Sequence, residues 1–554
     1  MRPYIVALLA ALSLSPATIT VSPNGNDSAD GVHAPVATIQ RAIDRAATFR
    51  SVGERVAIVL DGGTYFLSGT LVFRPITGNA PLVFTAKRGT MPVISGGTVI
   101  RGTRRTENGR MIIACDRSAS INQLFVNGRR YVRARSPNAD DIMFWHLSAS
   151  GARTSGGAGS FEYAADTVPV QGAEGAEIVF IRLWDISRFS VTGIDTAKRI
   201  LQFRVPPALK EVSHWGAHKP YYMENAASFL DAPGEWYYDP AAGEITVIPF
   251  PGDDLAAAEV IAPRLAHLIK FQGDPSQPVA NISFEGISFM HTTWSFPAEG
   301  YDGHQADLVI GAGIEGTYAE SISFSRCSFT AQGRYALGFQ TACRGITINA
   351  CTFTDIGAGA VLFGEAGNPQ RGSETMSNTF INCHVHHIGV IYPSAVGVWV
   401  GYAAYNRIAS NHIHNTPYSG ISVGWGWDRN PGGAHHNIIE RNYLHDIQEQ
   451  MGDGGAIYTQ SHQPGTVIRN NMIHDVFGQK TYGTGIYLDN YSSHITVSNN
   501  IVARTAGASH PQNDPRSNRI CNNVFVLPPT GVFHINKGVG GMFERNIIYI
   551  SEGP

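Results

Sequence analysis

Two consecutive segments between residues 439 and 500 repeat nearly the same pattern. Asn442 and Asn471 are 29 positions apart, and Tyr458 and Tyr487 have the same separation, so a whole unit has been repeated without a change in length. Each unit holds short apolar strand-like runs with no helical pattern between them. One such coil cannot bury its own apolar face and must stack on its neighbours. The repeat therefore predicts a solenoid built from β-strands.

A column of asparagines extends this repeat through the second half of the chain. Asparagine tolerates the left-handed backbone of a sharp bend, and stacked side-chain amides can hydrogen-bond along the column. The steps between column positions range from 23 to 32 residues, so the bend is kept while the loops vary. This column is similar to the asparagine ladder of right-handed parallel β-helices. Its members are Cys327, Cys351, Cys383, Asn411, Asn442, Asn471, Asn500, Asn523 and Asn546.

Three of the six cysteines occupy this column on successive coils. Neighbouring strands lie ~4.8 Å apart and a disulfide needs Cα atoms ~4.4–6.8 Å apart, so a bridge between neighbours is compatible with the geometry. We favour stacked thiols, because these cysteines replace asparagine at a packed bend. Cys115, Cys343 and Cys521 have no readable partner.

The first 17 residues have the layout of a secretory signal peptide, with Arg2, the apolar run 5–14 and Ser15-Pro16-Ala17 as a cleavage site. A buried strand or an uncleaved anchor is the alternative interpretation. Later in the chain no run approaches the ~20 apolar residues of a membrane span. We expect a secreted or periplasmic protein with no membrane association after cleavage.

Three further regions follow. Residues 18–117 contain a strand at 18–22, a capping helix with apolar residues spaced over 36–47, and the first coils at 55–60, 71–73, 82–85 and 93–94. Residues 118–263 are rich in tryptophan and lack the coil pattern, which indicates an inserted β-rich domain with a hairpin at 235–247. Irregular coils of the same solenoid are the alternative for this region. Residues 264–554 form the main parallel β-helix and carry the expected catalytic face.

Composition narrows the class of partner. The chain has 554 residues and a formal net charge of -3, which gives no electrostatic reason to expect nucleic acid or an anionic membrane surface as a partner. Its 60 glycines and 30 prolines suit many short strands joined by turns. A neutral or weakly charged ligand is the natural expectation.

Candidate functional residues follow from strand alternation at the end of the repeat. Ile486 and Leu488 face the core, so Tyr487 and Asp489 face outwards beside Tyr458 and Gln460 of the preceding coil. Asp453 stands among glycines, which leave room for a ligand to approach the backbone. The alternative is that Asp453 caps a turn and Asp489 is a solvated strand end.

Further candidates lie around this face. Trp425, Trp427 and Asp428 add aromatic surface and a carboxylate one coil earlier. His462 is a candidate sugar ligand or an exposed loop residue, and Glu365 is a reserve carboxylate in the register of Asn490. Aromatic rings and carboxylates together on a solenoid face suit an oligosaccharide or polysaccharide.

A column of histidines could indicate a metal site, but the coil repeat is enough to explain why the histidines recur. The histidines recur because the coil recurs, and the neighbouring column of Asp446, Asp475 and Arg504 suits turn capping with a salt bridge. We therefore predict no catalytic metal and no cofactor. The column consists of His386, His414, His445 and His474.

The segments 452–459, 485–489 and 123–130 resemble secreted β-helical glycoside hydrolases, most closely family 141. The resemblance implies that Asp453 and Asp489 are the catalytic pair and that the activity is of α-L-fucosidase or xylanase type. It covers nearly the whole mature chain, although the chain ends at Pro554 with no obvious C-terminal cap after Asn546.

A pair of carboxylates is what glycoside hydrolysis requires, one as acid and the other as base or nucleophile. Tyr482 holds the register of Asp453 seven positions before Asp489, so the glycines must bend the chain to bring the pair together. The lateral offset favours the wider spacing of ~6.5–9.5 Å that goes with inversion.

Two alternatives share the fold. A polysaccharide lyase would require a Lys or Arg base and often Ca²⁺. A carbohydrate-binding solenoid would need no carboxylate pair. Because fold alone does not decide among these, the sequence favours a hydrolase of plant or microbial polysaccharide on its acidic and aromatic residues.

Overall fold

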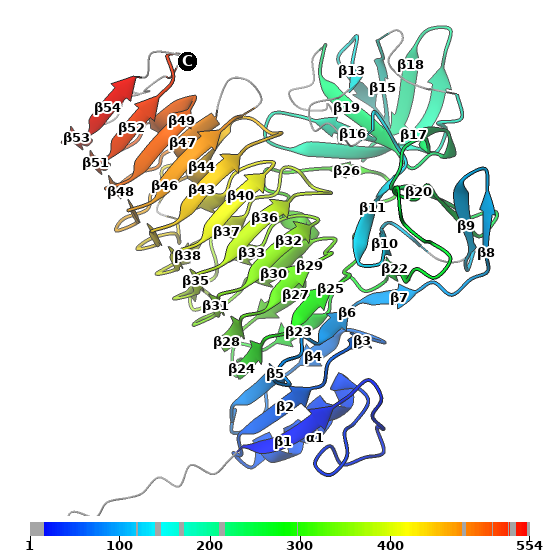
Figure 1. Cartoon of the computed structure of the whole chain (residues 1–554). Helices are drawn as coiled ribbons and strands as arrows, with labels where there is room; N and C mark the ends of the chain where they lie inside the picture. The colour runs from blue at the N-terminus through cyan, green and yellow to red at the C-terminus, as the bar shows by residue number, and fades with distance from the viewer. Residues whose placement is uncertain are drawn as a thin grey trace, which may run out of the picture.

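The protein is an elongated right-handed parallel β-helix with a second unit beside its upper half, as the computed structural model shows (Figure 1). The structure describes residues 16–550 apart from 118–119, 139–145, 165–170, 210–216, 296, 431, 479–482, 512–513, 530 and 532–538. Nearly all of the expected signal peptide lies outside the described residues. Within this part of the chain, no helix is long and apolar enough to cross a membrane.

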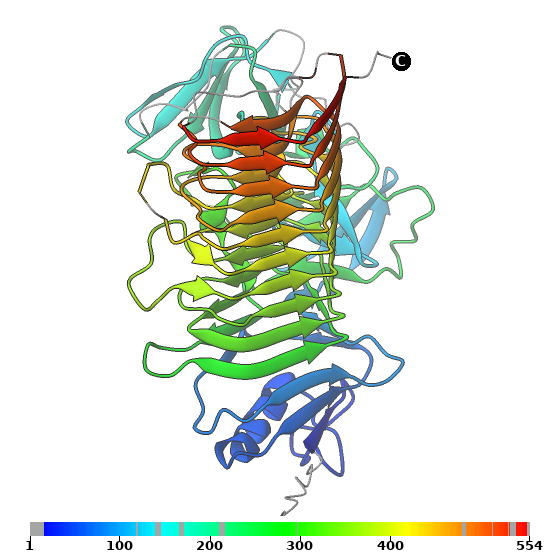
Figure 2. The same cartoon turned by 90° about the vertical axis from the view of Figure 1, so that its left-hand side faces the viewer.

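Three parallel sheets form the walls of the solenoid, and its coils stack along one axis (Figure 2). We call them sheets A, B and C. Sheet A contains β1 (Ala17–Val21), β2 (Val56–Leu60), β5 (Leu82–Ala86), β24 (Val279–Glu285), β28 (Ala319–Ser325), β31 (Thr347–Asn349), β35 (Thr379–Ile381), β39 (Arg407–Ala409), β42 (Ile438–Glu440), β45 (Val467–Arg469), β48 (Thr496–Ser498), β51 (Arg519–Cys521) and β53 (Met542–Glu544). Sheet B contains β3 (Thr64–Phe66), β6 (Val93–Ser95), β25 (Ser288–Met290), β29 (Ser328–Thr330), β32 (Thr352–Ile356), β36 (His384–Ile388), β40 (His412–Thr416), β43 (Tyr443–Ile447), β46 (Met472–Val476), β49 (Ile501–Thr505), β52 (Val524–Leu527) and β54 (Ile547–Ile550). Sheet C contains β4 (Leu71–Phe73), β23 (Ile269–Gln272), β27 (Ala312–Thr317), β30 (Tyr335–Phe339), β33 (Val361–Phe363), β37 (Val398–Val400), β41 (Ile421–Val423), β44 (Gly454–Thr459), β47 (Gly483–Leu488) and β50 (Gly507–Pro511). A small separate pair is formed by β34 (Thr375–Met376) and β38 (Ala403–Ala404), and short 3₁₀ turns occur at Ala227–Phe229 and Leu308–Ile310.

One apolar core runs through the solenoid from Ile19 to Leu527. Identical residue types stack from coil to coil: the rings of Phe289 and Phe329 lie 5.1 Å apart, and those of Phe329 and Phe353 lie 4.7 Å apart. Each coil therefore covers the apolar face of the next, which confirms the solenoid predicted from the repeat.

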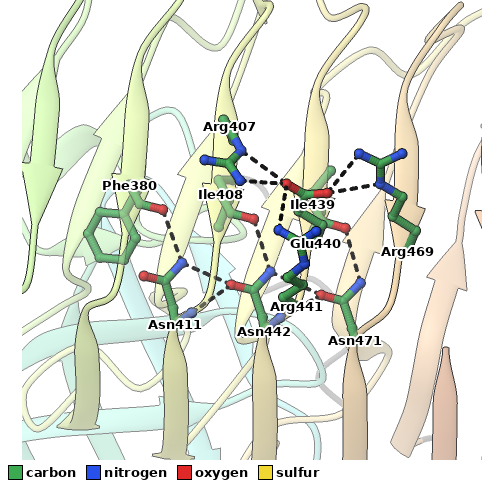
Figure 3. Close-up of polar contacts among 10 residues, drawn as sticks. All are labelled: Phe380, Arg407, Ile408, Asn411, Ile439, Glu440, Arg441, Asn442, Arg469 and Asn471. Carbon is green, nitrogen blue, oxygen red and sulfur yellow. Dashed lines mark hydrogen bonds and ion pairs between the residues drawn. The ribbon is translucent and has the colours of Figure 1, made fainter. Parts of the chain in front are cut away.

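The asparagine column forms the expected ladder (Figure 3). The Asn442 amide donates to Ile408 O at 3.0 Å and to Asn471 Oδ1 at 3.0 Å, while its Oδ1 accepts from the Asn411 amide at 2.9 Å. Burial alone would raise the pKa of the nearby Glu440 carboxyl, but hydrogen bonds from Arg407 and Arg469 bring it below its usual value.

The cysteine column is a stack of thiols. Cys383 N donates to Asn411 Oδ1 at 2.9 Å, so the cysteines share the ladder position. All six cysteines are free. This confirms our preference over a disulfide between neighbouring coils.

A single α-helix among the described residues, α1 (Ile39–Ser51), packs against β1 and β2 near the first coils. It begins later than the predicted span of 36–47, because Thr38 is the N-cap and its side chain accepts from Arg41 N at 3.2 Å. Its buried face consists of Ile39, Ala42, Ala46 and Arg50.

The inserted unit consists of two antiparallel sheets. The first follows the order β7 (Gly97–Val99), β22 (Val260–Pro263), β10 (Leu124–Val126), β11 (Arg129–Arg133), β20 (Glu235–Asp239), β21 (Glu244–Val247), β9 (Arg110–Ala114) and β8 (Arg104–Glu107), with β11 and β20 parallel. The second contains β12 (Arg135–Ser136), β13 (His146–Leu147), β14 (Arg153–Ser155), β15 (Ala158–Glu162), β16 (Glu177–Ile181), β17 (Ile186–Asp195), β18 (Ile200–Arg204), β19 (Pro220–Glu224) and β26 (Tyr301–Asp302). The hairpin predicted at 235–247 is β20 and β21. Antiparallel pairing already begins at β7, upstream of the boundary at 118 that the tryptophans indicated.

A buried ion network docks this unit on the solenoid. Arg133 and Arg188 both bind Glu177 and Glu224. The two guanidinium groups lie 5.4 and 4.8 Å from the ring of Trp294, which follows β25 of the solenoid.

Candidate active site

The two predicted tyrosines, Tyr458 and Tyr487, lie on the outer face of sheet C. Tyr458 and Tyr487 are direct partners on β44 and β47, whereas Ile486 and Leu488 lie in the core. This is the alternation expected from the sequence. The outward residues are nevertheless buried: Tyr458, Tyr487 and Asp489 are 2%, 4% and 6% exposed. The inserted unit and neighbouring loops cover this part of the face.

Asp453 lies immediately before β44 in a left-handed conformation, with φ 47°. This conformation bends the chain where it enters the strand, so the turn predicted for the glycines is made at Asp453 itself. Tyr487 Oη of the following coil donates to Asp453 Oδ1 at 3.1 Å. A straight strand would have carried this carboxylate away from Tyr487.

Asp489 directly follows β47 (Gly483–Leu488), and its side chain is held by residues of the preceding coil. Tyr458 Oη donates to Asp489 Oδ2 at 2.5 Å, and the Gln460 amide donates to Tyr458 Oη at 2.8 Å. Asn490 Nδ2 donates to the same carboxylate oxygen at 3.3 Å.

The two tyrosines cross between the aspartates. Their rings are 5.3 Å apart and nearly perpendicular, at 87°. Burial and the neighbouring aspartates, mainly Asp489, raise the pKa of both phenols well above the usual value. Both phenols therefore stay protonated donors, and each one fixes the aspartate of the other coil.

Two members of this cluster were missed by the sequence analysis. Gln305 Nε2 donates to Tyr418 Oη at 2.8 Å, and Tyr418 Oη donates to Asp453 O at 3.0 Å. Gln305 belongs to an irregular segment, so the repeat gave no signal for it. Tyr418 precedes β41, and its position above Asp453 depends on the loop conformation.

Three buried polar atoms on this face have no hydrogen-bond partner within the described part of the chain. They are Trp399 Nε1, Ser422 Oγ and Gln460 Oε1. Trp399, Ser422 and Tyr458 are successive partners across β37, β41 and β44, and Gln460 lies two residues beyond Tyr458. A buried polar atom without a partner is costly, so such atoms in one place indicate a site that a polar ligand completes.

An aromatic series extends from this point towards solvent. The rings of Trp399 and Trp425 are 5.5 Å apart, and those of Trp425 and Trp427 are 5.9 Å apart. Trp425 is buried and Trp427 is 52% exposed. Asp428, which follows, is exposed, and its carboxylate accepts hydrogen bonds from the backbone and side chain of Asn430.

Two other predicted residues, His462 and Glu365, make contacts away from the two aspartates. The His462 ring packs against His494, at 4.5 Å between centroids, and lies beyond the end of β44. Glu365 accepts a hydrogen bond from Thr341 Oγ1 near the end of β33. Neither side chain joins the network that holds the two aspartates.

The inserted unit reaches the cluster through the loop 182–185, between β16 and β17. Gly452 N, next to Asp453, donates to Leu183 O at 2.7 Å. Asp185 is buried and pairs with Arg182 at 2.5 Å. Burial is the largest influence and raises the pKa of Asp185 to about 7. No repeat marks this loop, so sequence reasoning did not connect it with the site.

Metal-ligand candidates lie on another sheet. Among the described residues, the one group of three side chains able to share a metal ion is on sheet B. The aspartates of sheet C are not part of it.

Comparisons with known proteins agree with this architecture. A family model described as "Right handed beta helix region" matches residues 311–502 and 371–548, and one described as "GH141 insertion domain" matches residues 111–250. A solved structure named "Glycoside hydrolase" is 25% identical with a TM-score of 0.81, over 92% of this chain and 96% of its own.

A second structure, "The complex structure of XylC with xylose", is 14% identical with a TM-score of 0.55, over 92% of this chain and 76% of its own, and shows the fold alone. A search of curated proteins gives no match. These findings confirm the resemblance stated from the sequence.

Proposed function

We propose that this protein, a β-helical glycoside hydrolase similar to family 141, hydrolyses plant or microbial polysaccharide with Asp453 and Asp489 as its carboxylate pair. The supporting observation is their mutual placement: each aspartate accepts a hydrogen bond from the tyrosine of the other's coil. Glycoside hydrolysis needs two carboxylates fixed on either side of one bond.

The proposed roles differ because the two environments differ. Asp489 accepts from Tyr458 and Asn490, an arrangement that suits the base or nucleophile. Asp453 stands at the start of the strand with Tyr487 Oη on one oxygen, and we assign it the role of the general acid. Protonated Tyr458 and Tyr487 hold the carboxylates in place and exchange no proton with the sugar.

A neutral sugar fits the surroundings of the pair. Trp399 Nε1 can donate to a hydroxyl, Gln460 Oε1 can accept from one, and Ser422 Oγ can do either. The aromatic series from Trp399 to Trp427 supplies flat surface for the rest of the chain. Xylan and fucosylated pectin are the substrate classes that the family resemblance favours, corresponding to xylanase or α-L-fucosidase activity.

The experiment is a screen of the purified protein against xylan and fucosylated pectin fragments, followed by the variants Asp453→Asn and Asp489→Asn. Each variant should lower turnover by about a hundredfold or more, since acid and base roles are worth ~10²–10⁴-fold. Circular dichroism and thermal unfolding should show that both variants are folded. A folded variant with normal turnover would remove that residue from the pair, and an unsaturated product would identify a lyase instead.

A further inference from the structure

The outer face of sheet B carries three histidines in a pattern that differs from the repeat. His412 and His414 are two residues apart on β40, so their side chains lie on the same face of the strand. His384 on β36 is the direct strand partner of His412. Two ligands from one strand and a third from its neighbour can surround a single ion. The side chains are partly buried, so solvent reaches them.

Their nitrogen atoms converge. His384 Nε2 and His414 Nε2 are 2.8 Å apart, and one ligand nitrogen from each of the three histidines lies within 4.8 Å of the others. In a tetrahedral zinc site with Zn–N bonds of ~2.0–2.1 Å, the nitrogen atoms stand ~3.4 Å apart. Small side-chain rotations would therefore produce the required spacing.

The orientation of His414 is already fixed by a neighbour. His414 Nδ1 lies 2.6 Å from Asn415 Oδ1, and Asn415 Nδ2 donates to Glu449 Oε1 at 2.9 Å. Because the amide oxygen can only accept, His414 Nδ1 carries the proton and Nε2 of the neutral ring keeps its lone pair. A hydrogen bond on the far nitrogen is what orients a metal-binding histidine.

The coil repeat explains only part of this group. The column that includes His386 and His414 continues as His445 and His474, whose Nδ1 atoms face Asp446 and Asp475 at 2.7 and 2.6 Å. The column two residues earlier is not a histidine column: its members are Thr352, His384, His412, Tyr443 and Met472. His384 and His412 are therefore specific to the two coils where a third nitrogen is within reach.

We propose that His384, His412 and His414 bind one divalent transition-metal ion, with Zn²⁺ as the natural occupant of three neutral imidazoles. Water would complete a tetrahedral site. The site is on a different sheet from Asp453 and Asp489, so its role is to tie β36 to β40.

The test uses the full chain without a histidine tag, stripped by a chelator and titrated with ZnCl₂ in a calorimeter. We expect one Zn²⁺ per chain, confirmed by metal analysis after dialysis, and visible absorption of tetrahedral type when Co²⁺ replaces it. Absence of binding, or a Co²⁺ spectrum of octahedral type, would overturn the proposal.

Variants separate this site from other histidines. His412→Tyr should abolish binding while keeping the ring stack, because Tyr443 occupies that register one coil later and stacks on His412 at 5.0 Å. His435→Ala removes a histidine in the segment before β42, whose Nδ1 lies 3.0 Å from Nδ1 of His436, and should leave binding unchanged. Equal binding by wild type and His412→Tyr would contradict the assignment.

Asn415 orients the His414 ring, so variants at this position provide a second test of zinc binding. Asn415→Asp should retain or tighten binding, since the next two coils carry aspartate, Asp446 and Asp475, at this left-handed position. Asn415→Gly keeps the backbone conformation but loses the acceptor, and should weaken binding about 10–100-fold. Identical affinity in both variants would rule out His414 as an oriented ligand.

Discussion

At the scale of single residues, the site depends on side chains that are outward-facing and yet buried. Alternation along the strand was enough to place Tyr487 and Asp489 on the outer face, because Ile486 and Leu488 must enter the core. Their burial could not be predicted, since the residues that cover them, such as Gln305, come from segments without a repeat. The left-handed φ of 47° at Asp453 was equally hidden, although aspartate is one of the residues that tolerates it.

Tyr458→Phe tests whether the tyrosine holds Asp489. The substitution removes the hydrogen bond to Asp489 Oδ2 and leaves a buried carboxylate oxygen with one donor fewer, at a cost of about 1–3 kcal/mol in unfolding free energy. We expect kcat/KM to fall at least about tenfold, since a misplaced catalytic group can cost ~10²-fold. Denaturant unfolding and steady-state kinetics measure the two effects, with Tyr443→Phe on sheet B as the matched control. Unchanged kcat/KM would show that Asp489 does not need this tyrosine.

At the scale of elements, the ladder was predictable in detail and the loop 182–185 was not. Ladder positions are defined by a backbone bend that recurs in every coil, so the sequence records them many times. The contact from Leu183 O to Gly452 N occurs once, between segments far apart in the chain, and no pattern in either segment marks it.

The ladder prediction concerns Asn442, which is 1% exposed. Asn442→Ala removes its bonds to Ile408 O and Asn471 and leaves the Asn411 amides without their acceptor. The loss of several buried hydrogen bonds should lower the unfolding free energy by about 2–5 kcal/mol. Asn430→Ala, on an exposed loop, should change it by less than about 0.5 kcal/mol. Equal stability of the two variants in denaturant would refute a structural role for the ladder.

The loop prediction concerns Asp185, whose pKa is raised to about 7, chiefly by burial. Between pH 4 and 7 the unfolded chain ionises this group while the folded chain keeps it protonated, so its contribution to stability is lost as pH rises. Asp185→Asn should therefore gain stability relative to wild type between pH 4.5 and 8, by roughly 1–4 kcal/mol. Calorimetric unfolding at both pH values measures this difference.

Asp195 supplies the control for that experiment. Backbone and side-chain hydrogen bonds from Lys198 lower the pKa of this exposed carboxyl, so Asp195→Asn should lose stability relative to wild type as pH rises. The stability difference between Asp185→Asn and wild type should change with pH. A difference that is independent of pH, or that changes in the same direction as that of Asp195→Asn, would contradict the raised pKa of Asp185.

At the scale of the whole molecule, the sequence predicted the right-handed β-helix and the presence of an inserted β unit, but not how they fit together. Stacking of coils follows from a periodic pattern of apolar residues. Docking depends instead on a shared apolar cluster that includes Ile181 of the insertion with Trp399 and Tyr418 of the solenoid, and on buried ion pairs behind it. No local sequence pattern marks these side chains, because each one packs against a residue of the other unit.

Trp294 provides the last prediction, because it is where the solenoid meets the ion network. Its ring is 2% exposed and lies beneath Arg133 and Arg188, and its carbonyl accepts from Asn122 Nδ2 at 2.9 Å. Trp294→Ala should loosen the inserted unit and with it the Leu183 contact beside Asp453. Since misplacement of about 1 Å can cost ~10²-fold, we expect kcat/KM to fall tenfold or more.

Trp294→Phe keeps an aromatic ring under both arginines and should retain most of the activity. Hydrogen exchange gives the second measurement: the amide of Gly452, which donates to Leu183 O, should exchange faster in Trp294→Ala and at the wild-type rate in Trp294→Phe. Faster exchange without loss of activity would mean that the inserted unit covers the site but does not position it. Loss of activity with unchanged exchange would show that the effect of Trp294 does not pass through the hydrogen bond between Gly452 and Leu183.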